Sequence, residues 1–232
     1  MGITVEAELI FVLGINTKGL SFTMDKKYVY IVISRTQTKF AKCIRCFGKI
    51  KYNHSAIGLD ADLKELYAFS RPRYRAIFLG RLDRETLNRY TMDKDQAVPV
   101  VVFKLPVSSK MYYNIRKYIE EVSYDSEYMY NLFSVLTYPI THGFATYKTF
   151  NCTEFVAHLL KTMNYPLDHP AYRYKPDDFL EILKEYIIFD GDLREYMKCD
   201  DVDEAYFSHL GLKEVFQNFW AMLRIIGRTY FS

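Results

Sequence analysis

Two short stretches of this sequence carry residue types that together could perform nucleophilic chemistry, and the first contains Cys152. It follows Asn151, a favoured residue at a helix N-cap, and Glu154 stands where a capping box places an acid. Cys152 is therefore expected to begin a helix, where free N–H groups and the helix dipole stabilise a thiolate. Apolar residues follow at helical spacing, so the thiol should face the side that the helix buries.

The second stretch contains His54, which is expected at the start of a strand with the small residues Ala56 and Gly58 on the same face. An imidazole can hold a thiol proton, the thiolate can attack an acyl carbon, and helix N–H groups can bind the oxyanion. A strand histidine and a helix-start cysteine are thus the two parts of a thiol-hydrolase site. Taken singly, they are also compatible with a cysteine that only packs and a surface histidine.

Length and composition limit what these two residues can belong to. The 232 residues suit one domain, residues 1–232, and 50% are hydrophobic, which allows a substantial core. The net charge of +3 comes without a basic block, so nucleic-acid binding is not suggested. No apolar stretch is long enough for a transmembrane segment. The N-terminus shows no secretory signal and has Glu6 where myristoylation requires Ser or Thr, so a cytoplasmic location is expected.

The elements that must position His54 and Cys152 follow from hydrophobic spacing and turn residues. Strands are expected at residues 8–13, 28–34, 97–105 and 186–189, and a hairpin at 54–70 turns at 60–62. Helices are expected at residues 36–50, 108–122, 126–136 and 176–185, from Cys152, and from about 203. Residues 71–95 are mixed, with either a short strand near 76–79 or an inserted lid. The pattern predicts an α+β domain whose central antiparallel sheet packs against the Cys152 helix.

The last part of the chain is expected to form a helical extension over about 176–232, beyond a core of about 28–165. Its final helix should dock on the domain through one apolar face at helical spacing. The members of that face are Val215, Phe219, Met222, Leu223 and Ile226.

A further pair of cysteines, Cys43 and Cys46, lies on the helix expected at 36–50. A Cys-x-x-Cys pair can be a redox pair or half of a zinc site. No second Cys/His pair stands at a suitable spacing, so packing on one helix face is favoured. No metal and no cofactor are expected. The four cysteines do not suggest a disulfide scaffold in a chain of this length.

The two stretches resemble motifs of a known family. Residues 53–59, Asn-His-Ser-Ala-Ile-Gly-Leu, look like the N-H-x-x-I-x-L strand of the circularly permuted NlpC-type cysteine hydrolases. This papain-like group includes the YiiX proteins and the lecithin–retinol acyltransferases. Residues 150–156, Phe-Asn-Cys-Thr-Glu-Phe-Val, look like the C-S/T-E-F-V helix of the same group. The histidine precedes the cysteine along the chain, as in that group and opposite to papain.

The resemblance implies a papain-like fold, with Cys152 as nucleophile and His54 as general base. It also implies a polar residue on the strand after the histidine that orients the imidazole. The best alignment places Tyr67 there, with Ser70 and Glu65 as alternatives. A tyrosine would act as a neutral acceptor, which stabilises an imidazolium less than a carboxylate does.

Together these features predict a thiol hydrolase or acyltransferase that works through a covalent thioester at Cys152. Its substrate would be a peptide, another amide or a lipid ester. The alternative is a binding module that keeps the papain-like fold without turnover, for which a merely polar third residue would be typical.

Overall fold

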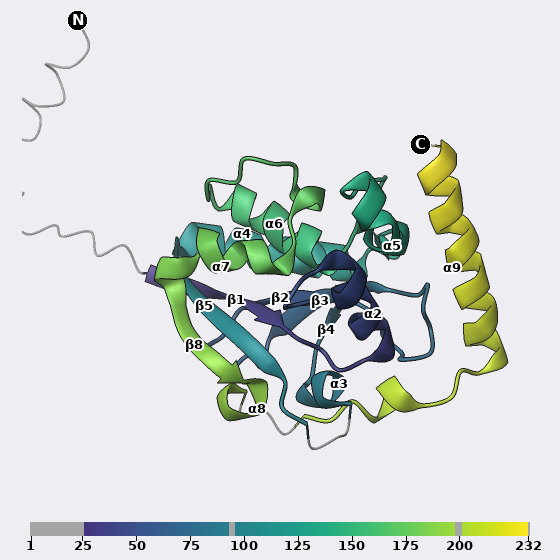
Figure 1. Cartoon of the computed structure of the whole chain (residues 1–232), viewed down its shortest axis with the longest axis horizontal. Helices are drawn as coiled ribbons and strands as arrows, with labels where there is room; N and C mark the ends of the chain where they lie inside the picture. Colours follow the sequence, from purple (N-terminus) through teal and green to yellow (C-terminus); the bar gives the residue numbers. More distant parts are fainter. Residues whose placement is uncertain (1–25, 93–95, 198–200, 232) are drawn as a thin grey trace, which may run out of the picture.

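A six-stranded antiparallel sheet runs through the middle of the molecule, in the order β4-β3-β2-β1-β5-β8 (Figure 1). The computed structural model describes residues 26–92, 96–197 and 201–231. The strands are β1 (Lys26–Ser34), β2 (His54–Gly58), β3 (Leu66–Ser70), β4 (Arg81–Arg84), β5 (Pro99–Ser108) and β8 (Ile187–Asp192). The predicted α+β class with an antiparallel sheet is confirmed, while the strand expected at 8–13 lies outside the described residues.

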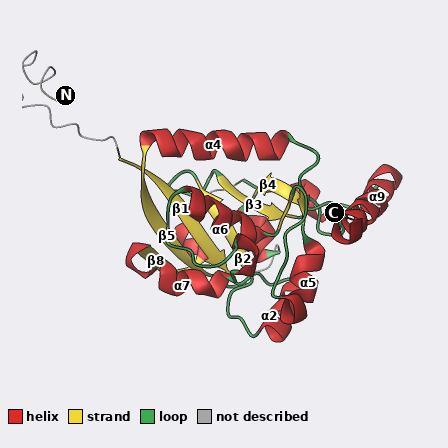
Figure 2. Cartoon of the chain, turned by 90° about the horizontal axis from the view of Figure 1, so that it is seen from above, coloured by secondary structure: helices red, strands yellow, loops and turns green. Residues whose placement is uncertain are grey.

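Helices cover both faces of this sheet (Figures 1 and 2). On one face lie α4 (Ser109–Tyr124), α6 (Cys152–Thr162) and α7 (Phe179–Ile182), and on the other lie α3 (Leu87–Thr91) and α8 (Leu193–Tyr196). At one end of the sheet stand α2 (Lys39–Gly48) and α5 (Leu132–Thr141). The short strands β6 (Met129–Tyr130) and β7 (Thr149–Phe150) pair in parallel just before α5 and α6.

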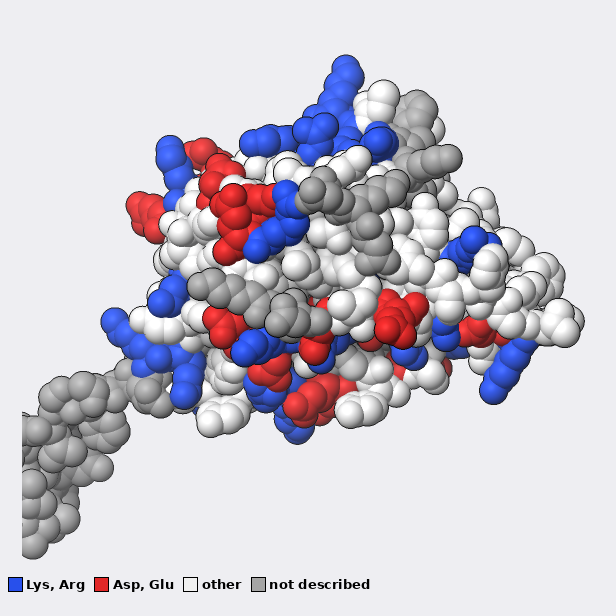
Figure 3. Space-filling model, turned by 90° about the horizontal axis from the view of Figure 1, so that it is seen from below, with Lys and Arg blue, Asp and Glu red and all other residues white. Residues whose placement is uncertain are grey.

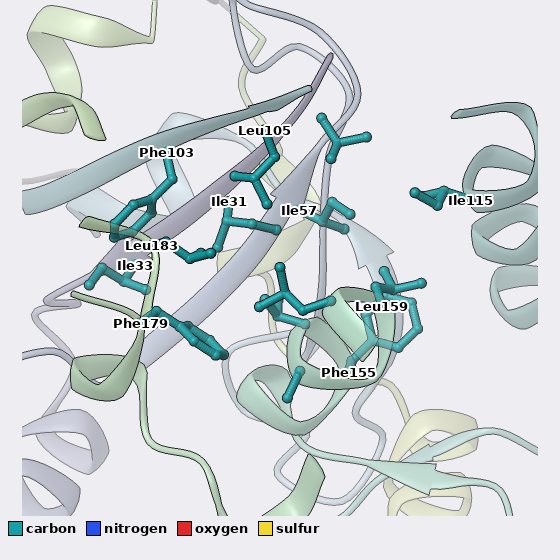
Figure 4. Close-up of a cluster of buried hydrophobic side chains, with 14 of the residues drawn as sticks. Ile31, Ile33, Ile57, Phe103, Leu105, Ile115, Phe155, Leu159, Phe179 and Leu183 are labelled. Carbon is teal, nitrogen blue, oxygen red and sulfur yellow. The ribbon is translucent and has the colours of Figure 1, made fainter. Parts of the chain in front are cut away.

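The core has two layers because the central strands bury both of their faces. Along β1, Ile31 and Ile33 point to the α6 side, whereas Tyr30 and Val32 point to the α3 side. Strands buried on both faces read as continuous apolar runs, as β1 and β5 do. Figure 4 shows Phe155 and Leu159 of α6 against the sheet residues of the first layer. This packing fixes α6, and with it Cys152, over β2 and β3.

Two predicted elements are displaced in the structure. The strand after the hairpin is β4, at 81–84 rather than 76–79. The helix expected at 126–136 is α5, which begins after Asn131 because the Asn131 side chain accepts a hydrogen bond from the Ser134 N–H at 3.2 Å. Pro139 lies inside α5 instead of ending it. Asp125 accepts from the Glu127 N–H, so residues 125–128 form a turn instead.

The predicted docking face of the last helix, α9 (Leu212–Phe231), is wrong. Val215 and Phe219 are exposed, and the buried residues are Ala221 and Ile225, which contact Met129. Hydropathy did not identify this stripe because its other contact residues, Asn218 and Ala221, are polar or small. Ala221 permits close approach, and Asn218 accepts a hydrogen bond from the Phe78 N–H at 2.9 Å. Figures 1 and 2 show α9 at one end of the molecule, away from the sheet.

The surface carries mixed charge. In Figure 3, Lys and Arg side chains alternate with Asp and Glu over the face seen from below. No helix among residues 26–92, 96–197 and 201–231 combines the length and apolar character needed to cross a bilayer.

Candidate active site

Cys152 is the first residue of α6, as predicted from the capping signal. The Asn151 side chain accepts a hydrogen bond from the Glu154 N–H at 2.9 Å, and the Glu154 carboxylate accepts from the Asn151 N–H at 3.2 Å. This capping box leaves the other first-turn N–H groups directed toward the helix N-terminus, where the thiol lies. The Cys152 side chain is buried, with 5% of the residue exposed.

His54 is the first residue of β2, and the Cys152 thiol lies close enough to its imidazole for each group to shift the pKa of the other. Two further contacts join β2 to the start of α6. The Ser55 backbone N–H lies near the Cys152 sulfur and helps to lower the pKa of the thiol, and the hydroxyls of Ser55 and Thr153 lie 3.2 Å apart. The structure therefore brings together the two residues that the sequence singled out, although they lie in distant parts of the chain.

Glu85 supplies the carboxylate of the site. Its Oε2 accepts a hydrogen bond from His54 Nε2 at 2.8 Å, and the Tyr90 hydroxyl donates to the same oxygen. Glu85 is 4% exposed and stands between β4 and α3, with its N–H bonded to the Leu66 carbonyl at 2.8 Å. Since Nε2 is directed at Glu85, Nδ1 is the ring nitrogen left for the thiol.

Tyr67 is not the residue that orients His54, contrary to the prediction. It pairs with Ile57 in β2, and paired residues of neighbouring strands share a face. Ile57 and His54 are three positions apart, so they point to opposite faces of the sheet. The Tyr67 ring accordingly packs on the core layer beneath α4 and α6.

The two alternatives to Tyr67 have other surroundings. Glu65 accepts two hydrogen bonds from Arg116, at 2.9 and 2.5 Å, so both of its carboxylate oxygens take part in that ion pair. Ser70 does lie near the site, because it lines the same cavity as His54 and Glu85. Glu85 was not predicted from the sequence because the orienting residue was expected on β3. Glu85 instead follows β4, in the segment 71–95 that was interpreted only as mixed. No local pattern separates it from the other acids of that segment.

The charges of the site favour a thiolate–imidazolium pair. Burial by itself raises the pKa of Cys152. The charge of His54 and the interactions with His54, Ser55 and Thr153 lower this pKa by more than burial raises it, so the net pKa is below its ordinary value. Burial alone lowers the pKa of His54, but Glu85 and Cys152 more than offset this, leaving the pKa well above its ordinary value. The Glu85 pKa is lowered overall, because His54 and Tyr90 outweigh burial.

Tyr130 completes the polar surroundings of the sulfur. Its hydroxyl lies near Cys152, and burial followed by the nearby thiolate raises the pKa of Tyr130 well above its usual value. The hydroxyl therefore remains a neutral donor. Together with the first N–H groups of α6, it can face an oxyanion that forms beside the sulfur.

Two adjoining cavities meet at this group of residues. The apolar cavity, of about 410 Å³, is lined by Cys152, Val135, Leu136, Pro139, Ile140 and Tyr174, among others. The second cavity, of about 90 Å³, is lined by the polar residues His54, Glu85, Ser70, Arg71, Arg89 and Tyr206 together with apolar residues such as Phe69, Ile77 and Leu132. It is called the polar cavity below because of the first group. Ile44, Asn53 and Tyr130 line both, so they form the partition between the two.

The other cysteines and histidines of the described chain lie elsewhere. Cys46 is exposed, so it does not pack as expected, and the side chains of Cys43 and Cys199 fall outside the description. His158 points away from Cys152 and contacts Tyr118 and Phe150. Within the described ranges, no group of three or more His, Cys, Asp and Glu side chains is arranged to hold a metal ion.

Comparison with known proteins gives no relative, since no family model, curated protein or solved structure matches this chain. What the site can do is therefore argued from its own geometry.

Proposed function

We propose that this protein is a cysteine hydrolase or acyltransferase with a papain-like arrangement of its site. Cys152 would be the nucleophile, His54 the general base and acid, and Glu85 the carboxylate that orients the imidazole. The observation that carries the proposal is the buried thiol–imidazole–carboxylate chain at the N-terminus of α6. A nucleophile, a base and an orienting group in series are the recurrent parts of such catalysts.

In the first half of the reaction, the Cys152 thiolate attacks the carbonyl carbon of an amide or ester. The carbonyl electrons move to its oxygen, which the Tyr130 hydroxyl and the α6 N–H groups would stabilise. When the oxyanion collapses, the bond to the leaving nitrogen or oxygen breaks. The His54 imidazolium gives its proton to that atom, and a thioester to Cys152 remains.

In the second half, water or another hydroxyl or amine attacks the thioester. His54 takes the proton of the attacking group, and the second oxyanion collapses to expel the thiolate. With water the product is a carboxylic acid, and with another acceptor the acyl group is transferred. Glu85 keeps the imidazole in the tautomer that both steps require, because it accepts from Nε2 throughout.

The apolar cavity supports an acyl portion that is itself apolar. Its walls from α5 and from residues 174–176 are mainly hydrophobic and extend from the sulfur. Concave apolar pockets beside a few polar groups are typical of ligand sites. An aliphatic acyl chain or a large apolar peptide side chain fits this description, within the predicted classes of peptide, amide and lipid ester.

The alternative function is binding without turnover. The reason for considering it was that Tyr67, a polar but uncharged residue, was expected to orient the imidazole. Glu85 replaces Tyr67 in that position, and a buried carboxylate stabilises the imidazolium that turnover requires. That reason for an inactive module therefore no longer applies.

Alkylation by iodoacetamide tests the proposal directly. Cys152 should react at neutral pH much faster than the exposed Cys46, despite being less accessible, and a His54→Ala variant should lose this advantage. Mass spectrometry of the peptides gives each rate separately. Labelling of Cys152 that is slower than that of Cys46 and indifferent to His54→Ala would contradict the proposal.

A further inference from the structure

Two residues that line the polar cavity carry buried hydrogen-bonding groups that no described residue pairs with. Ser70 Oγ and Arg89 Nη1 are both buried, and neither has a hydrogen-bond partner among the residues that the structure describes. The Arg89 side chain is only 9% exposed. Buried polar groups are nearly always paired in folded proteins, so two unpaired ones on residues that line one cavity point to a ligand.

The rest of Arg89 is firmly held, so that Nη1 is presented in a fixed position. Its Nε and Nη2 donate to Asp203 at 2.9 and 2.5 Å, and Nη2 also donates to Asp83 at 3.0 Å. The third nitrogen has no such contact. A guanidinium fixed through two of its nitrogens is a rigid donor for an oxygen atom.

Of the charged groups that line the cavity, the acceptor is already used and the guanidinium groups are donors. Glu85 lines it but already accepts from His54 and Tyr90. Arg71, which also lines the cavity, donates to the Tyr74 carbonyl and brings a second guanidinium. The group that fits is therefore an oxygen acceptor, and at about 90 Å³ it is a small one.

The position of this cavity relative to the catalytic chain identifies which part of a substrate it would hold. His54 gives its proton to the leaving group, and His54 lines the polar cavity. Cys152 keeps the acyl group, and Cys152 lines the apolar cavity. The leaving group thus enters the polar cavity, and the acyl group enters the apolar one.

We propose that the substrate is an N-acyl amino acid or a peptide end of that chemistry: an apolar acyl group joined by an amide to a small leaving group with an oxygen acceptor. Ser70 and Arg89 would hold that acceptor, for which the carboxylate of a short amino acid is the simplest case. The proposal rests on the proposed function. The Cys152 thiolate takes the acyl group, the C–N bond breaks, and the amine leaves with the proton of His54. Water then hydrolyses the thioester.

Three probes with one acyl chain and different leaving groups test this assignment: N-octanoylglycine, N-octanoylglycinamide and N-octanoylisobutylamine. The last has nearly the same shape but no acceptor. We expect kcat/KM, from amine release, to be at least about tenfold higher for glycine than for isobutylamine, as a charge-assisted hydrogen bond implies. If kcat/KM for N-octanoylglycinamide is close to that for N-octanoylglycine, the cavity accepts a neutral amide oxygen as well as a carboxylate, which also supports the assignment.

Ser70→Ala should reduce the ratio of the glycine rate to the isobutylamine rate several-fold. Its fold should be intact, since Ser70 Oγ bonds to no described residue, and a thermal melt would verify this. Ser123→Ala is the matched control, because Ser123 Oγ is likewise buried and unpaired but lies on α4. It should leave the ratio unchanged. Arg89→Lys is a second variant for the same ratio, because a lysine lacks the planar guanidinium that presents Nη1.

Equal rates for all three probes, or a ratio that Ser70→Ala does not alter, would overturn the leaving-group assignment while the proposed function stands. Labelling of Cys152 that depends on His54, with no cleavage of any probe, would overturn the substrate class alone. Failure of that labelling would instead overturn the proposed function.

Discussion

Glu85 Oε2 lies 2.8 Å from His54 Nε2, although His54 begins β2, Glu85 follows β4, and β3 lies between these two strands. Glu85 precedes α3 on one face of the sheet, whereas the thiol on the other side of the imidazole comes from α6 on the opposite face. The carboxylate thus holds the ring at Nε2, which leaves Nδ1 as the nitrogen available to the sulfur.

Replacing Glu85 with Gln should strongly reduce turnover while the protein still folds. The amide can donate to Nε2 and so select the wrong tautomer, and it removes the charge that stabilises the imidazolium. We expect kcat to fall by about 10²- to 10⁴-fold, measured with any acyl substrate that the wild type cleaves. Tyr67→Phe is the control. If it reduces kcat as much as Glu85→Gln does, the assignment of Glu85 is wrong.

The reactivity of Cys152 should depend little on pH across the neutral range. The pKa of Cys152 is lowered and that of His54 is raised, so a thiolate and an imidazolium coexist over a wider pH range than they would as isolated groups. Alkylation by iodoacetamide should therefore form a plateau. In a His54→Ala variant the rate should instead rise toward alkaline pH, as for a free thiol with a pKa of about 8.5. A wild-type profile of that rising shape would count against the ion pair.

Glu154 should make the free energy of unfolding fall as the pH rises. Burial raises its pKa to about 8 from an unfolded value of 4.5, and its bond to the Asn151 N–H only partly opposes this. Between these values the folded protein holds a proton that the unfolded chain has lost, so stability falls over that window, by up to about 1.4 kcal/mol per pH unit. Glu154→Gln keeps an acceptor and removes this dependence.

Urea unfolding of the wild type and of Glu154→Gln at several pH values from 5 to 8 gives the measurement. The difference in free energy of unfolding should grow with pH in favour of the variant. Two curves that stay parallel would show that Glu154 does not titrate in this window.

Asn151 should contribute both to stability and to the acidity of the thiol. Asn151→Ala removes the side-chain acceptor for the Glu154 N–H and should lower the free energy of unfolding by about 1 kcal/mol. Asn151→Asp keeps an acceptor but adds a negative charge beside the sulfur. It should therefore raise the thiol pKa, seen as an alkaline shift of the alkylation profile, with less loss of stability. Equal loss of stability in the two variants would contradict the capping role.

The docking face of α9 can be tested with two apolar residues of the same helix. Ile225 is 1% exposed, so Ile225→Ala should cost about 2–5 kcal/mol, less if the helix end unfolds locally. Phe219 is 50% exposed, and Phe219→Ala should cost far less. Chemical denaturation of both variants gives the comparison. A larger loss for Phe219→Ala would restore the face expected from hydropathy.

Cys152 and His54 could be identified from the sequence because their signals are local. A capping pattern fixes where α6 begins, and small residues beside a histidine mark β2. Glu85 could not be identified, because its role depends on how the chain turns from β4 into α3. The contact face of α9 was hidden for a similar reason, since Asn218 and Ala221 gain their importance only from what they meet.

The order of the three residues along the chain has a consequence for biosynthesis. A ribosome makes the polypeptide from its N-terminus, so the imidazole and the carboxylate emerge well before the sulfur. When the thiol emerges, the two groups that would activate it have already been synthesised, and α6 has only to settle on the sheet to complete the group.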